Sequence, residues 1–344
     1  MRVDDRPRRH VPGPARRDDP RAVVAVDVGG TTTKAALVSA DGLPLRTVTR
    51  ASGTGDAAVA AVADAVRELR DAAPSLGRDV VATGVVTPGL LDERTGVVAY
   101  ASNLDWRDLP LRDRLTAALG MPVATGHDVR AAGLAEQLYG AARGYADVVL
   151  IPIGTGVAAS LTSAGAAVAG ATGGSGEIGH VPVVPDGEPC TCGQRGCLEV
   201  YVSGAGVARR YAARTGRALR AEQVVDLVGT DPDADAVWAD AVRVLAQGLV
   251  TVTLLLDPAV IVLGGGFLAA GDRLLGPVRA GLDAGLAWRS APPVRVAQLG
   301  AQGGRIGASV LAFRHAGHLD VPAAWDAEVL LGADLGATAG STAG

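Results

Sequence analysis

One histidine and three cysteines lie close together in the chain, at His180, Cys190, Cys192 and Cys197. One imidazole and three thiolates form a complete tetrahedral ligand set for Zn²⁺, and the glycines between them allow the loop to fold around an ion. Because the protein fills all four positions, the predicted zinc is structural and does not activate water. Three reduced, inert cysteines are the alternative. An odd number of cysteines in one short segment does not form a disulfide framework, which favours a thiol-reducing, cytoplasmic compartment.

Two glutamates flank these metal-ligand candidates. Glu177 lies three residues before the histidine, and Glu199 lies two residues after the last cysteine. Carboxylates bind sugar hydroxyls through charge-assisted hydrogen bonds. We therefore predict that the zinc loop positions both acids against a carbohydrate, with solvated loop acids as the alternative.

A glycine turn follows the first apolar run of the sequence. Its candidate cofactor-binding residues are Asp27, Gly29, Gly30, Thr31 and Thr32. Glycines at such a turn let backbone N–H groups approach an oxyanion, and Asp27 is an acid suited to hold a hydrated Mg²⁺. A tight hairpin whose glycines only supply a positive φ is the alternative.

Two further glycine turns occupy comparable places later in the chain. Gly154, Thr155 and Gly156 repeat the strand, turn and strand pattern, and Gly264, Gly265 and Gly266 lie between a strand and a helix. The first two turns together predict a polyphosphate site between two domains. The third suits a flat base against exposed backbone, with an ordinary strand-to-helix turn as its alternative.

Asp128 is the candidate general base. It lies where a short strand meets a helix, and a carboxylate there can take the proton from an attacking hydroxyl in phosphoryl transfer. Helix capping is the alternative role. The run from Asn103 to Trp106 precedes the same junction, and its amide and indole are suited either to a sugar or to capping and packing the next helix.

Composition limits what these residues can belong to. The 344 residues are 48% hydrophobic and 20% charged, with a formal charge of -4. This length fits two domains, and this charge gives no field that would collect nucleic acid or anionic membrane. The apolar run 250–256 is interrupted by Asp257, so no membrane helix is predicted. Residues 1–21 are rich in arginine and lack an apolar core, which predicts a disordered basic tail.

Apolar periodicity predicts the elements that must position these residues. Strands are expected at 22–28, 34–39, 43–49, 80–86, 122–124, 148–153, 157–162, 259–263 and 293–297. Helices are expected at 56–70, 109–119, 129–139, 206–214, 234–256, after 266, and at 304–315, with a loop at 90–105. The two strand–glycine–strand units lie roughly 125 residues apart, which suggests a duplicated architecture. The tail from Pro322 is left unassigned or disordered.

Taken together, these pieces resemble the ROK family of bacterial sugar kinases and sugar-responsive repressors over residues 22–313. The specific match is a Glu-x-Gly-His followed by Cys-x-Cys-Gly-x-x-Gly-Cys-x-Glu, which runs from Glu177 to Glu199. The resemblance implies an α/β, two-domain actin-like ATPase fold (ribonuclease H-like, duplicated) with an interdomain cleft. We expect a smaller domain at 22–127 with 304–318, a larger domain at 128–303 that holds the zinc loop 177–199, and a C-terminal tail at 319–344.

The resemblance also assigns roles by position. Phosphate binding falls on the first two glycine turns and adenosine binding on the third. Asp128 is then the base, and His180 both ligates zinc and touches the sugar. The remaining sugar-side residues are Gly89, Asn103, His127, Glu177 and Glu199.

The chain departs from the family pattern at two places. The usual Asn-Asp-Ala-Asn run is replaced by His127-Asp128-Val129-Arg130, and Thr32 stands where a lysine often follows Gly-Gly-Thr. The base is kept, but the amide beside it is lost.

The expected activity is that of an ATP-dependent hexokinase, most simply a cytoplasmic, homodimeric glucokinase that uses Mg²⁺ and carries structural Zn²⁺. The alternatives are a kinase for N-acetylmannosamine, N-acetylglucosamine or fructose, and a catalytically silent sugar sensor. Family repressors carry a helix-turn-helix domain before the first strand, and only about 21 residues precede Ala22, so no nucleic acid is expected as a partner.

Overall fold

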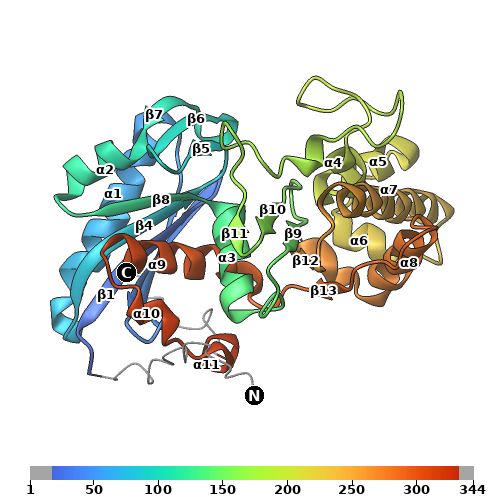
Figure 1. Ribbon diagram of the computed structural model, residues 1–344. Coiled ribbons are helices and arrows are strands. Elements are labelled where there is room, and N and C mark those ends of the chain that lie inside the picture. Colours follow the sequence, from blue (N-terminus) through green and yellow to red (C-terminus); the bar gives the residue numbers. More distant parts are fainter. Residues whose placement is uncertain (1–17, 333–344) are drawn as a thin grey trace, which may run out of the picture.

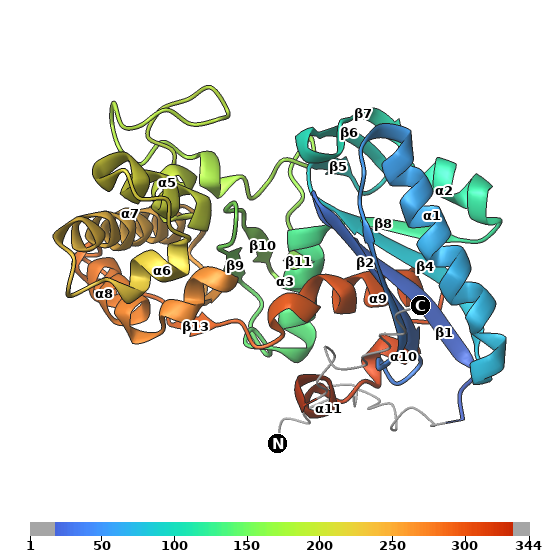
Figure 2. The same ribbon diagram turned by 180° about the vertical axis from the view of Figure 1, so that it is seen from behind.

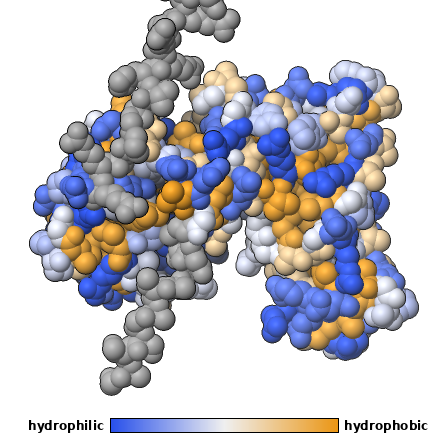
Figure 3. Space-filling view, turned by 90° about the horizontal axis from the view of Figure 1, so that it is seen from below, coloured by the Kyte–Doolittle hydropathy of each residue, from blue (hydrophilic) through white to orange (hydrophobic). Residues whose placement is uncertain are grey.

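The computed structural model describes residues 18–332 as two α/β lobes, with helices α3 (Asp128–Tyr139) and α9 (Gly303–His315) between their sheets (Figures 1 and 2). Residues 1–17 of the predicted tail 1–21 lie outside the described residues. Seen from below, the surface is indented between the two lobes (Figure 3).

The first lobe is built on a five-stranded sheet ordered β3-β2-β1-β4-β8. The first three strands run antiparallel to one another, and β4 and β8 extend the sheet in parallel. Helix α1 (Gly55–Ala72) packs on this sheet through its apolar stripe. The strands are β1 (Arg21–Val28), β2 (Thr32–Ser39), β3 (Pro44–Ala51), β4 (Asp79–Thr87) and β8 (Val123–His127).

A small three-stranded sheet replaces most of the loop predicted at 90–105. Its strands are β5 (Leu90–Asp92), β6 (Val97–Ala101) and β7 (Trp106–Pro110), with the 3₁₀ turn η2 (Ser102–Leu104) before β7. The loop prediction was wrong because strands of three to five residues leave little periodicity to detect. Helix α2 (Leu111–Leu119) follows, and the 3₁₀ turn η1 (Pro74–Leu76) precedes β4.

The second lobe repeats the pairing pattern of the first. Its sheet is ordered β11-β10-β9-β12-β13, with β9 antiparallel to β10 and parallel to β12, as β1 is to β2 and β4. This confirms the predicted duplicated α/β fold. The strands are β9 (Val148–Pro152), β10 (Ser160–Ser163), β11 (Ala166–Ala167), β12 (Val260–Gly264) and β13 (Val294–Val296).

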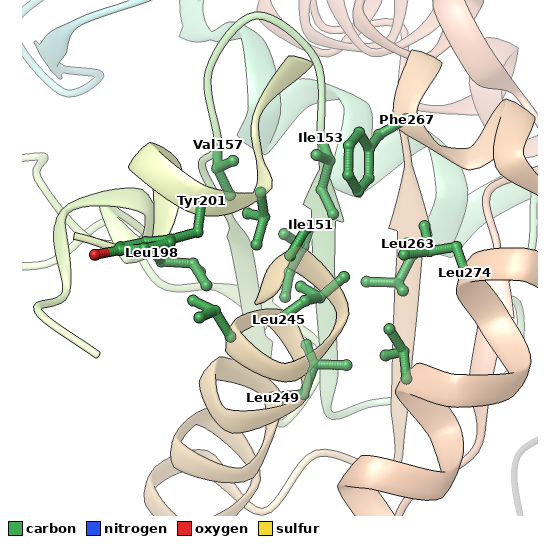
Figure 4. Close-up of a cluster of buried hydrophobic side chains, with 14 of the residues drawn as sticks. Ile151, Ile153, Val157, Leu198, Tyr201, Leu245, Leu249, Leu263, Phe267 and Leu274 are labelled. Carbon is green, nitrogen blue, oxygen red and sulfur yellow. The ribbon is translucent and has the colours of Figure 1, made fainter. Parts of the chain in front are cut away.

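Helices cover one face of this second sheet and close its core. The long helix α7 packs against α4, α5 and α8. Leu245 and Leu249 of α7 meet Ile151 of β9 and Leu263 of β12 in this core (Figure 4). The helices are α4 (Leu198–Val202), α5 (Gly204–Thr215), α6 (Ala221–Asp226), α7 (Pro232–Leu256) and α8 (Asp272–Ala284), and the 3₁₀ turns are η3 (Ile178–His180), η4 (Gly266–Ala270) and η5 (Gly300–Gln302).

Helix α7 is the one described helix that is long and apolar enough to cross a membrane, and 44% of its most apolar window is buried in the lobe.

Helix α9 returns to the first lobe and packs on β1, β4 and β8, with α3 beside it. Two glycines make this close packing possible. A Cβ at Gly84 would clash with the carbonyl of Ala308, and a Cβ at Gly307 would clash with that of Ala131. The placement of α9 supports the domain division at 22–127 with 304–318 and 128–303, which stays a prediction.

The C-terminal segment is folded further than expected. Helices α10 (Asp320–Ala323) and α11 (Ala327–Gly332) pack beside the first sheet, around the buried Trp325. The Trp325 Nε1 donates to the carbonyl of Ala40 at 2.7 Å. The disorder considered for the tail from Pro322 is therefore not found up to residue 332, and residues 333–344 lie outside the described part of the chain. The C-terminal tail boundary at 319–344 stays a prediction.

Candidate active site

A cavity of about 660 Å³ lies between the lobes. It is bounded by the ends of β4 and β8, the turn after β9, η2, η3 and the start of α4. The structure brings together in its lining all seven residues predicted for the sugar side, which are Gly89, Asn103, His127, Asp128, Glu177, His180 and Glu199. Their individual roles remain predictions.

Asp128 occupies the first position of α3. Its Oδ1 accepts a hydrogen bond from the Val129 amide at 2.7 Å, and its side chain keeps 29% of its exposure. Burial raises the pKa of Asp128, while the Val129 amide and the nearby Arg130 guanidinium lower it. A carboxylate with a raised pKa at the edge of a cavity is suited to accept a proton from a bound hydroxyl.

His127 caps the same helix. Its Nδ1 lies 3.2 Å from the Val129 amide nitrogen. Burial, helped by the charge of Arg130, lowers the pKa of His127 to about 4, so the imidazole is neutral at pH 7. A neutral imidazole at this position provides the cavity with a polar group that carries no charge.

The glycine turn between β9 and β10 is hydrogen-bonded to Glu199, which follows the predicted zinc ligands in the chain. Glu199 Oε2 accepts a hydrogen bond from the Val157 amide at 2.8 Å, and a Cβ at Gly156 would lie 2.8 Å from the same oxygen. Glu177, the residue immediately before η3, also lines the cavity. The two predicted sugar acids therefore line one cavity from separate elements.

The predicted zinc ligands converge. One ligand atom from each of His180, Cys190, Cys192 and Cys197 lies within 4.8 Å of all the others. The Cys192 and Cys197 sulfurs are 3.7 Å apart, and the Cys190 sulfur is 3.7 Å from His180 Nδ1. A tetrahedron with Zn–S bonds of about 2.3 Å has S–S edges of about 3.8 Å, so the donor set fits zinc.

The backbone of this loop depends on one glycine in particular. Gly196 has φ +73°, and a Cβ there would clash with the carbonyl of Val184. The Gly196 amide donates to the backbone carbonyl of Glu188 at 2.9 Å, and the Gly196 carbonyl accepts from the amides of Val183 and Val184. The close approach brings the loop back on itself, so that Cys190 and Cys197 lie on opposite sides of one turn.

The first glycine turn lies beside the sugar cavity rather than in its lining. The Gly29 amide donates to the Thr32 carbonyl at 3.0 Å, and a Cβ at Gly30 would lie 3.0 Å from the Cβ of Asn103. The sequence prediction placed this turn on the phosphates, and the structure places it against a residue that lines the cavity.

Asp27 stands at the carboxyl end of β1, opposite Lys34 on β2. Burial and the neighbouring charge of Asp128 raise the pKa of Asp27 to about 6, against the opposing effects of Lys34 and Arg305. The amino end of α9 is also close, since a Cβ at Gly304 would lie 2.9 Å from Asp27 Oδ2. A carboxylate at this position is suited to hold a hydrated Mg²⁺.

A second cavity of about 590 Å³ adjoins the first at Gly154. Thr155 and Gly266 line this second cavity, together with Arg220, Glu222 and Phe267. Gly156 and Gly265 line the first cavity instead, and Gly264 is buried at the end of β12, where its carbonyl accepts from Ile153. The predicted nucleotide glycines that line a cavity therefore divide between two neighbouring cavities that share Gly154.

Several residues around these cavities were missed from sequence. Arg305 lies near Asp27 and belongs to α9, a helix that packs on a sheet built from residues far away in the sequence. Arg220 lies at the start of α6, a helix that was not predicted. Glu93 lies inside the segment predicted as a loop. None of these carries a local motif, so only the fold reveals them.

Comparisons with known proteins agree with this geometry. Residues 23–315 match the family model described as "ROK family". A glucokinase of Streptomyces coelicolor is 34% identical over 312 residues, covering 84% of this chain and 96% of that protein. A solved ROK family glucokinase from Streptomyces griseus, in complex with glucose and AMPPNP, is 32% identical with a TM-score of 0.73 and covers 85% of this chain and 99% of its own.

A similarity to a regulator is shorter. The DNA-binding transcriptional dual regulator NagC of Escherichia coli is 33% identical over 150 residues, which is 44% of this chain and 37% of that protein. The match of the family model to most of the chain, together with the glucokinase relative, shows that this chain belongs to the ROK family.

Proposed function

We propose that the chain is an ATP-dependent glucokinase that transfers the γ-phosphoryl group to the 6-hydroxyl of glucose. The observation that carries this proposal is the single cavity lined by all seven predicted sugar-side residues, joined at Gly154 to a second cavity. The glucokinase relatives, aligned over most of their length, support glucose as the acceptor.

In this mechanism Glu177, Glu199 and Asn103 bind the sugar hydroxyls, and Asp128 orients the acceptor hydroxyl and takes its proton. The turns at Gly29–Gly30 and Gly154–Gly156 present backbone N–H groups to the phosphates. The adenine end of ATP occupies the second cavity, near Gly266. When bound beside Asp27, Mg²⁺ supplies neutralisation of the triphosphate charge.

His180 and the three cysteines hold zinc for structure alone, since a closed set of four leaves no position for water. Because the set uses His180 Nδ1 and His180 also lines the sugar cavity, zinc fixes one wall of that cavity. The metal thus stabilises the loop between Glu177 and Glu199.

The assembly and location are proposed from the family resemblance. We infer a cytoplasmic homodimer whose interface includes the exposed leucines at the end of α7, where Leu255 is 76% exposed. Sedimentation equilibrium tests this: a dimer that Leu255→Ser converts to monomer supports it, and a monomeric parent contradicts it.

The test of the activity is a panel of glucose, fructose, N-acetylglucosamine and N-acetylmannosamine in a coupled ADP-release assay. We expect glucose to give the highest kcat/KM. A higher value for another sugar transfers the proposal to that acceptor. Sugar binding by calorimetry with no ADP formed identifies a silent sensor instead.

A further inference from the structure

Arg130 places a buried positive charge two residues after Asp128. Its side chain is 3% exposed, and all three of its nitrogens are hydrogen-bonded. Nε donates to Glu93 Oε1 at 2.8 Å, Nη1 to the Gly173 carbonyl at 2.9 Å, and Nη2 to the Leu91 carbonyl at 3.3 Å. A buried guanidinium with every nitrogen bonded defines a fixed position, since buried polar groups are costly to leave unpaired.

Glu93 joins this cation to the other side of Asp128. The same Oε1 that accepts from Arg130 also accepts from the His127 backbone amide at 3.0 Å. His127 is the last residue of β8, and Arg130 lies in the first turn of α3. One carboxylate oxygen therefore holds the chain immediately before and two residues after Asp128.

The contact of Arg130 Nη1 with Gly173 reaches the segment that leads to Glu177. Gly173 has φ +78°, and a Cβ there would clash with the carbonyl of Leu91. This segment therefore lies against β5, and the Gly173 carbonyl accepts a hydrogen bond from Arg130 Nη1. Glu177 follows four residues later, at the wall of the sugar cavity.

We propose that Glu93 and Arg130 are positioning residues that fix Asp128 relative to Glu177 across the sugar cavity. Neither is among the described residues that line the cavity, so both act through the residues they hold. The inference rests on the proposed function, because it takes Asp128 as the group that receives the proton.

Arg130 also contributes a positive charge near Asp128. The other titratable or charged groups around this carboxylate are His127 on β8, Asp27 on β1 and Glu177 before η3. The positive charge of Arg130 lowers the pKa of Asp128. Removing the cation should therefore move the acid limb of kcat/KM to higher pH.

The experiment compares Glu93→Gln, Arg130→Met and the double variant with the parent. Glu68→Gln and Arg50→Met serve as matched controls, since they alter an Arg–Glu ion pair on β3 and α1 of the same lobe. Each test variant should lower kcat by about 10-fold or more with KM for glucose changed less than about threefold. The loss of kcat in the double variant should be smaller than the product of the two single losses, because the two residues share the Nε–Oε1 contact.

Circular dichroism and the melting temperature establish that each variant is folded. Arg130→Lys, which keeps the charge, serves where Arg130→Met fails to fold. A folded Glu93→Gln, Arg130→Met or Arg130→Lys variant with unchanged kcat overturns the inference. A folded Arg130→Met variant whose acid limb does not move to higher pH overturns it as well, whereas Arg130→Lys keeps the charge and is judged by kcat alone. If the parent is active, Asp128→Asn is inactive and the pair variants match the controls, only this inference fails. A parent that phosphorylates no sugar overturns the proposed function and this inference together.

Discussion

Glu199 accepts a hydrogen bond from the Val157 amide at 2.8 Å, which ties the start of α4 to the turn between β9 and β10. Glu199 is two residues from the zinc-ligand candidate Cys197, and the turn ends at Gly156. The predicted metal loop, the sugar cavity and the predicted second phosphate turn therefore share one fixed contact. A disturbance of any one of them should affect the other two.

Zinc removal should weaken sugar binding. We expect about one zinc per chain by elemental analysis, and a loss of glucose affinity of at least 10-fold after chelation or in Cys197→Ser, because the loop between Glu177 and Glu199 loses its anchor. Calorimetry measures the affinity, and zinc added back to the chelated parent is the control. A zinc-free chain that binds glucose normally would contradict the structural role of the metal.

Substitution of Glu199 should separate its two contacts. Glu199→Gln keeps an oxygen for the Val157 amide but removes the charge offered to sugar hydroxyls, whereas Glu199→Ala removes both. We expect glucose affinity to fall about 10-fold in the first variant, and both glucose and ATP affinity to fall in the second. Equal ATP affinity in the two variants would show that the turn does not depend on this contact.

Asp27 should make stability depend on pH. Its pKa in the folded chain is raised to about 6, so the folded state binds its proton more tightly than the unfolded state, and stability falls as pH rises from about 4 to 6. Asp27→Asn removes the titrating carboxyl, and with it this loss of stability at higher pH. We expect the variant to be more stable than the parent by up to about 3 kcal/mol at pH 7.5 without nucleotide or Mg²⁺, and no more stable at pH 4.

The same variant should lose most of its kinase activity, because Asp27 is the proposed metal carboxylate. Urea unfolding at the two pH values measures the stability difference, with the exposed Asp56→Asn as control. A parent and variant of equal stability at pH 7.5 would show that folding does not disfavour the charged form of the Asp27 carboxylate.

Trp325 should anchor the C-terminal segment to the first lobe. Its ring lies 5.5 Å from that of Tyr139 and 6.0 Å from that of Phe313, and it is 7% exposed. Trp325→Ala should destabilise the lobe by about 3–5 kcal/mol, the range for a buried tryptophan. Chemical denaturation measures this, and a loss below about 1 kcal/mol would mean that the segment contributes little to the fold.

The long elements and the cluster of His180 with the three cysteines were predictable from sequence because their signals are local. The apolar stripe of α1, the apolar run of β1 and the spacing of the cysteines each lie within about twenty residues. The twin pairing of β1 with β2 and of β9 with β10 follows from two similar local patterns.

The rest depends on contacts between distant residues. Trp325 donates to Ala40, 285 positions away, and Arg130 pairs with Glu93, 37 positions away, so neither partner is visible in a sequence window. In the candidate site, Asn103 and Asp128 have ordinary capping roles as local alternatives. Only the family resemblance assigned them to the sugar, and only the fold brings them to one cavity.

The most direct test of the account is the turnover of Asp128→Asn with saturating glucose and ATP. The amide keeps the size and hydrogen bonding of the side chain but cannot accept the proton from the sugar hydroxyl. The account predicts that glucose binds with nearly the parental affinity while kcat falls by at least about 10²-fold, the lower range for loss of a general base. A kcat within a few-fold of the parent would contradict it.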